Sequence, residues 1–328
     1  MGRRAYALVG VASLVLAGTN ARAQQVDPGC ARSFGAVQDA CQKTVDLFQL
    51  MAPQLATAVT AGNATLGEAG TLGGLGHFTI EARGNVVRGA VPFINNATLG
   101  TVGAEHTNFK TSNVAIPAAF IDGGVGLFRG FGVGLTHVGG VDVLGSAFYA
   151  PNYTGHGIAV RPDRGVELGY GARVGIVDET PVSPAVSVTF MERDLPTTQI
   201  TGVDNDGDSL RVRNLSVKTS AWRAVIGKHF LIVGLAAGIG QDHEKSSTDI
   251  TASGGILGVF TTSALASPSQ SLTRTNYFGD LSFDPPLVHV IFEVGGVTAR
   301  EIETFNTFSG VHAGDSLLYG SVGVRLKI

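Results

Sequence analysis

The stretch Arg274–Thr298 reads RTNYFGDLSFDPPLVHVIFEVGGVT, and it decides the fold class. Two runs of about 10 residues flank Asp284-Pro285-Pro286, and in each run apolar residues alternate with polar or small ones. Alternation with a period of two is typical of a β-strand that has one apolar face. Two adjacent prolines fit a turn and not the interior of a strand or helix. The stretch therefore predicts a β-hairpin whose strands have the length of tilted strands that cross a bilayer.

The same alternation recurs along the chain. It is found in residues 77–87, 114–128, 138–149, 166–177, 184–193, 210–226, 230–240 and 317–328. Within 210–226, Lys218 and Arg223 disturb the phase, which a β-bulge would explain. Together with the hairpin these runs predict about ten strands. The weakly patterned region 91–109 could hold a further pair, so the alternative is twelve.

The connections between these runs alternate between long and short. The short ones are 178–183, 227–228 and 284–286, and the long ones are 87–113, 150–165, 194–209, 241–272 and 298–316. Short periplasmic turns and long external loops are typical of outer-membrane barrels. The 46 glycines also fit a barrel, where they leave room inside and let the wall bend. We therefore predict an all-β fold, an antiparallel transmembrane β-barrel; a soluble all-β protein is the alternative.

Three segments are expected along the chain. Residues 1–23 have the pattern of a signal peptide, with basic residues, an apolar run and a small-residue cleavage site. Residues 24–73 form an N-terminal helical or plug segment, and residues 74–328 form the barrel. Helical spacing of apolar residues covers 36–61, where Pro53 is expected to kink or divide the helix. Such a helix could plug the lumen or lie against the periplasmic rim.

The two cysteines, Cys30 and Cys41, lie in the part of the chain that is expected to be exported. Thiols are oxidised outside the cytoplasm, so the pair predicts a disulfide that closes a small loop at the start of the helix. Free thiols and a metal pair are the alternatives.

Charged residues on the expected inner face form the candidate site. They are Glu81, Arg83, Glu167, Arg173, Arg193, Arg274, Asp280, His289, Glu293, Arg325 and Lys327. One interpretation is a polar pathway or a cluster that orients a substrate. The other is mutual ion pairing that fills a narrow lumen, because small barrels are just wide enough to be filled by side chains.

Signals for other chemistry are weak. Asp204, Asp206 and Asp208 alternate as in a calcium loop, but the loop lacks the glycine and the glutamate that such a site uses. No cofactor and no other metal is predicted. The net charge of −3 gives no basic footprint for nucleic acid. We find no catalytic motif and expect no enzyme, although the residues of a lipid hydrolase would meet only in space.

From residue 74 onwards the chain resembles Gram-negative outer-membrane β-barrel proteins. The run Leu317–Ile328 looks like the C-terminal signal that the barrel-assembly machinery recognises, although it ends in isoleucine instead of an aromatic residue. The helical segment ahead of the first strand is loosely similar to the hatch of hydrophobic-compound transporters of the fatty-acid type. The resemblance implies the outer membrane of a bacterial cell, with outer-membrane lipid and the assembly machinery as partners.

The first function hypothesis is passive transport or uptake of a small, possibly hydrophobic solute. The second is a structural or adhesive barrel that acts through its external loops, chiefly 241–272. A membrane lipid hydrolase is the third. A sealed lumen would contradict an open transport path, whereas it would agree with the second hypothesis.

Overall fold

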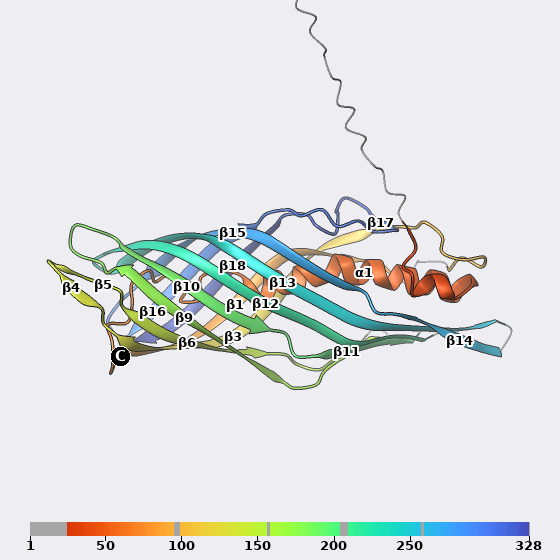
Figure 1. Cartoon of the computed structure of the whole chain (residues 1–328), viewed down its shortest axis with the longest axis horizontal. Coiled ribbons are helices and arrows are strands. Elements are labelled where there is room, and N and C mark those ends of the chain that lie inside the picture. The colour runs from red at the N-terminus through yellow and green to blue at the C-terminus, as the bar shows by residue number, and fades with distance from the viewer. Residues whose placement is uncertain (1–24, 95–98, 156–157, 204–208, 257–258, 328) are drawn as a thin grey trace, which may run out of the picture.

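The computed structural model describes residues 25–94, 99–155, 158–203, 209–256 and 259–327. Within them a closed barrel of ten antiparallel strands is formed, as predicted (Figure 1). Its strands are β1 (Phe78–Pro92), β3 (Thr111–Phe128), β6 (Val141–Tyr149), β9 (Val166–Val177), β10 (Ala185–Asp194), β12 (Ser209–Phe230), β13 (Val233–Ile256), β15 (Ser269–Phe283), β16 (Val288–Val297) and β18 (Leu317–Lys327). The last strand, β18, pairs with the first, β1, and closes the wall.

Shorter strands extend the wall at one end. They are β7 (Tyr153–Gly155), β8 (Ile158–Pro162), β11 (Thr198–Val203) and β14 (Val259–Ala266). Two small pairs complete the described strands: β2 (Asn108–Phe109) with β17 (Thr307–Phe308), and β4 (Phe131–Val133) with β5 (Thr136–Val138). The prediction that 241–272 forms a long external loop is wrong, because most of these residues lie in the strands β13, β14 and β15.

Two further expectations need correction. Pro53 does not divide the helix, since α1 runs without interruption from Gly35 to Thr60 after a short 3-10 turn, Cys30–Arg32. Lys218 and Arg223 are in phase, because Lys218 is exposed outside the wall and Arg223 is buried inside it. The register of β12 shifts instead between Arg213 and Ser216.

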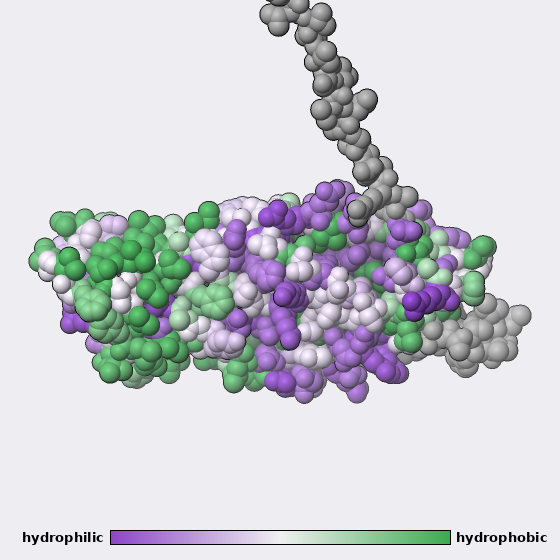
Figure 2. Space-filling view, in the orientation of Figure 1, coloured by the Kyte–Doolittle hydropathy of each residue, from purple (hydrophilic) through white to green (hydrophobic). Residues whose placement is uncertain are grey.

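The outer face of the wall changes character along each long strand. On β13 and β15 the outward cross-strand partners Leu235 and Leu281 are apolar, and so are Ile239 and Tyr277. The next outward partners, such as Gln241 and Thr275, are polar. Figure 2 shows the result as a hydrophobic zone at the end with the short turns and a hydrophilic surface beyond it. An apolar band around a barrel is the surface that faces lipid in a membrane.

The strands are longer than a membrane requires. β13 has 24 residues, which is roughly 80 Å of strand, whereas a tilted strand crosses a bilayer with about 9–11 residues. The barrel therefore continues beyond the apolar zone as a hydrophilic half. The strands β7, β8, β11 and β14 widen the wall there. Among the described helices, none is both long and apolar enough to cross a membrane.

The N-terminal segment lies inside the barrel (Figure 1). Cys30 and Val37 pack against Ile250 and Ala266 in the hydrophilic half, at the end with the long connections. From there α1 points into the lumen, and residues 61–77 continue to the opposite end, where Phe78 begins β1. The segment thus enters the barrel at one end and leaves it at the other.

The apolar zone gives a first prediction about stability. Leu281→Arg places a charge on the lipid-facing wall and should lower the free energy of unfolding by about 2–4 kcal/mol. Ser269→Arg, on the same strand and face but in the hydrophilic half, should change it little. Denaturant unfolding in lipid vesicles, followed by the fluorescence of Trp222, measures both. Equal effects of the two substitutions would show that the bilayer does not end between these positions.

Candidate functional site

The lumen holds a stretch of backbone, residues 61–77, outside the regular helices and strands. Buried N–H groups need acceptors, and carboxylates on the wall provide them. Glu293 Oε2 accepts the N–H of Asn63 at 2.7 Å, and Asp280 Oδ2 accepts that of Gly67 at 3.0 Å. Further along, the carboxylate of Asp142 accepts the N–H of Leu72 at 3.1 Å. Side chains of the wall thus replace the partners that a helix or sheet would supply.

Arginines on the wall bind residues 61–77 and the C-terminal part of α1. Among the described residues, five of them each pair with a wall carboxylate and also donate to an oxygen of residues 53–66. The ion pairs are Arg83–Asp122, Arg173–Asp142, Arg223–Asp242, Arg274–Glu244 and Arg325–Glu81. The oxygens, in the same order of arginines, are Asn63 O, Thr65 Oγ1, Thr60 O, Pro53 O and Leu66 O.

The geometry at Arg173 shows how such a bridge works. Its Nε and Nη2 both lie 2.8 Å from Asp142 Oδ2, and its Nη1 donates to Thr65 Oγ1 at 2.8 Å. Both charged side chains are fully buried. A buried charge is stable only when it is paired and hydrogen-bonded, so the segment and the wall need each other.

The helix itself organises the far end of the barrel. Asp39 accepts the N–H groups of Gly100 and Glu105 at 2.7 and 2.9 Å. Asp46 accepts those of Phe305 and Asn306 at 3.1 and 2.8 Å. Burial raises the pKa of Asp46 above its usual value, although its hydrogen bonds to Asn306 oppose this. Two carboxylates of α1 thereby hold two of the long connections over the mouth of the barrel.

Glycine lets the segment approach the wall at two points. Gly62 has φ +83° and Gly67 has φ +73°, values that other residues rarely adopt. A Cβ at Gly62 would lie 1.8 Å from Glu293 Oε1, and one at Gly67 would lie 2.8 Å from a methyl carbon of Ile291. Any larger residue would displace the segment from its partners.

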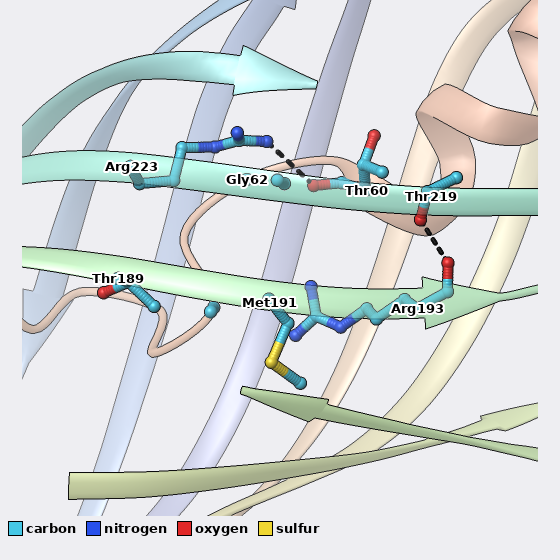
Figure 3. Close-up of a pocket in the computed structure, with 9 residues that line it drawn as sticks. Thr60, Gly62, Thr189, Met191, Arg193, Thr219 and Arg223 are labelled. Atoms are coloured by element: carbon cyan, nitrogen blue, oxygen red, sulfur yellow. Dashed lines mark hydrogen bonds between the residues drawn. The ribbon is translucent and has the colours of Figure 1, made fainter. Parts of the chain in front are cut away.

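The space left around the segment is small. One cavity, where α1 ends between β10 and β12, measures about 10 Å³ (Figure 3). Thr60, Gly62, Met191 and Arg223 are among its lining residues. A second cavity, beside Glu68 and Arg325, also measures about 10 Å³. A water molecule needs about that much space, so these cavities hold at most single waters.

Most of the charged residues predicted from the sequence meet in this lumen. Eight are buried there: Glu81, Arg83, Arg173, Arg193, Arg274, Asp280, Glu293 and Arg325. Glu167 instead lies at the edge of the wall, where it pairs with the exposed Arg164 at 3.5 Å. His289 lies near the short turns and contacts Asp284 at 2.7 Å. The side chain of Lys327 and the calcium candidates Asp204, Asp206 and Asp208 lie outside the described part of the chain.

The disulfide prediction is confirmed: Cys30 and Cys41 are bonded, with a Cα–Cα distance of 5.5 Å. The sequence reasoning missed most of the carboxylates that neutralise the arginines. Asp122 lies within the expected strand 114–128, and Asp242 and Glu244 lie in the stretch 241–272 that the sequence predicts as a loop. Asp142 and Arg223 fall on the inner face by simple alternation, so the sequence pattern was enough to predict that both side chains point into the lumen.

Comparisons with known proteins add little to this geometry. No protein-family model matches the chain, and no curated protein sequence matches it. Among solved structures, it is similar to Ail, the attachment invasion locus protein of Yersinia pestis, at 12% identity over 77% of this chain and 99% of that one, with a TM-score of 0.28. It is also similar to the toluene transporter TodX of Pseudomonas putida, at 9% identity over 83% and 92%, with a TM-score of 0.26. An anion-selective porin from Comamonas acidovorans matches at 12% identity over 76% and 98%, with a TM-score of 0.18. Likenesses at this level carry no argument about function.

The class of the protein follows from the molecule itself. A closed antiparallel wall, an apolar zone around its outside, a charged interior and short turns at the apolar end together define an outer-membrane β-barrel. In such barrels the short turns face the periplasm and the long connections face the exterior. We therefore expect the hydrophilic half and the start of α1 to lie outside the cell.

The ion pair that holds α1 gives a second prediction. Arg274→Met leaves the buried Glu244 without its cation and removes the contacts to Pro53 and Thr57. Removing one partner of a buried pair should lower the free energy of unfolding by about 3–5 kcal/mol. The double variant Arg274→Met/Glu244→Gln should recover part of that loss. If the single variant is as stable as the wild type in denaturant unfolding, the helix does not depend on this pair.

The path of the segment gives a third prediction, about topology. A short epitope inserted before Gln25 should be reached by an antibody on intact cells, because this end of the segment lies at the external mouth. An epitope in the turn at Leu231, at the other end of the barrel, should be reached only after the outer membrane is permeabilised. The reverse pattern of labelling would overturn the assigned orientation.

Proposed function

We propose that the protein is a surface-binding or adhesive barrel that acts through its hydrophilic half outside the membrane. The observation that carries this proposal is the filled lumen, in which α1 and residues 61–77 extend from one end of the wall to the other. The strands of the barrel extend well beyond the membrane, and a simple membrane pore does not need this additional wall. That region is where a partner in the medium would meet the barrel.

An open path for a small solute, the first hypothesis from the sequence, would require residues 61–77 to leave the lumen. The contacts of Arg83, Arg173 and Arg325 oppose such a movement, because each would lose a partner while remaining buried. The cavities beside the segment are also too small for an organic solute. The adhesive hypothesis therefore has better support, but its working surface differs from the expected loop. Most of the described residues of 241–272 form parts of β13, β14 and β15 instead.

Conductance in planar bilayers separates the two functions and is the fourth prediction. Purified, heat-modifiable protein should show no steady open channel. A variant that lacks residues 25–77 should conduct if it still folds, since neither α1 nor residues 61–77 then occupy the lumen. Arg274→Met, which retains the whole segment, is a second test and should show at most brief openings. A steady conductance of the intact protein would contradict the proposal and restore passive transport.

A further inference from the structure

A hollow on the outside of the wall has features that the lumen does not explain. It lies on β8, β11 and β12, in the hydrophilic half, and has a volume of about 390 Å³. Binding sites for small ligands occupy about 300–1,000 Å³. We call it the arginine hollow. Its lining residues are Ala159, Arg161, Gln199, Thr201, Arg211 and Arg213.

Strand geometry sets the spacing of the three arginines. Arg211 and Arg213 are two residues apart on β12, so they point to the same side with about 7 Å between them. Arg161 lies on β8, which is separated from β12 by β11, at about 10 Å across the sheet. Gln199 is the register partner of Arg161, and Thr201 is that of Arg211. Amide and hydroxyl groups therefore lie between the charges.

Within the described part of the chain, no ion pair is formed by Arg161, Arg211 or Arg213. Asp249, the register partner of Arg213 on β13, accepts hydrogen bonds from Asn214 and Ser267 at 2.7 Å each. Asp204, Asp206 and Asp208 lie outside the described residues. Three like charges around one hollow repel each other, and an anion would remove that cost.

The height of the hollow argues against the bilayer as the source of that anion. Trp222 is an exposed apolar residue of β12 at the edge of the apolar zone, and Arg213 lies nine residues further out on the same strand. At about 3.3 Å per residue and a tilt of about 45°, Arg213 lies roughly 20 Å above that edge. Lipid head groups extend only about 5–8 Å from the hydrocarbon. The ligand must therefore reach the hollow from the medium.

The lining also indicates the kind of molecule that carries the anion. Guanidinium groups bind tetrahedral oxyanions with two hydrogen bonds at a time. Ala159 is the one apolar residue of the lining, so there is no pocket for the apolar side chains of a peptide. Hydroxyl-rich sugars suit the remaining amide and hydroxyl groups. We infer that the arginine hollow binds a polysaccharide from outside the cell that bears sulfate or phosphate groups. This inference rests on the proposed function, because it names the class of partner that the hydrophilic half would hold.

Binding of dextran sulfate to the full-length protein in detergent micelles tests the inference, with uncharged dextran as the control ligand. Binding should be measurable for dextran sulfate alone and should weaken as salt screens the charges. The triple variant Arg161→Gln/Arg211→Gln/Arg213→Gln should bind roughly tenfold more weakly or worse, since it loses several charge-assisted hydrogen bonds. The matched control is Arg164→Gln, an exposed arginine outside the hollow, which should bind like the wild type.

Three outcomes would overturn the inference. They are wild-type protein that does not bind dextran sulfate, a heat-modifiable triple variant that binds it as well as the wild type, and binding that is displaced equally by vesicles bearing phosphorylated lipid. None of these results depends on whether the lumen conducts. The proposed function fails separately, if the intact protein forms a steady channel in the bilayer experiment.

Discussion

The structure depends on one constraint: the backbone of residues 61–77 lies inside a closed wall, and its polar groups need partners there. Water can provide few of them, because two cavities beside the segment measure about 10 Å³ each, which is room for one molecule. The wall provides them through pairs of arginine and carboxylate, in which the arginine also binds the segment, as Arg173 does with Asp142 and Thr65. The same contacts therefore explain three features. They require charged residues on the inner wall, they fix the path of the segment, and they keep the lumen closed.

The contacts of the inner wall differ between residues 61–77 and the helix α1. Around residues 61–77 the contacts are charged, because irregular backbone needs hydrogen-bond partners. Around α1 they are mixed: Phe48 packs against Leu215, whereas Pro53 accepts a hydrogen bond from the buried Arg274. A helix satisfies most of its own backbone, so apolar contact can take a larger share there.

The sequence predicted the ten barrel strands because lipid on one side and a filled lumen on the other produce strong alternation. The same reasoning failed at 241–272 for a physical reason. In the hydrophilic half the outward residues Gln241 and Lys245 are as polar as the inward residues Asp242 and Glu244. The two faces of the strand then no longer differ in polarity, so the sequence pattern of the strand resembles that of a loop. The arginines of the site were visible as inward charges, but their partners depend on register and on the path of the segment, which no spacing in the sequence records.

The path of the segment also restricts how the barrel can be put together. β1 follows the segment directly in the chain and pairs with β18, so the seam between the two ends of the wall closes beside the point where the segment leaves. The other end of the segment is already outside, next to β14. The order of events therefore matters: the chain must be threaded before the seam is sealed, or drawn through afterwards as a single extended strand. New sequence can be added to the long connections without cost to this process, whereas a folded module ahead of Gln25 would be too wide to pass.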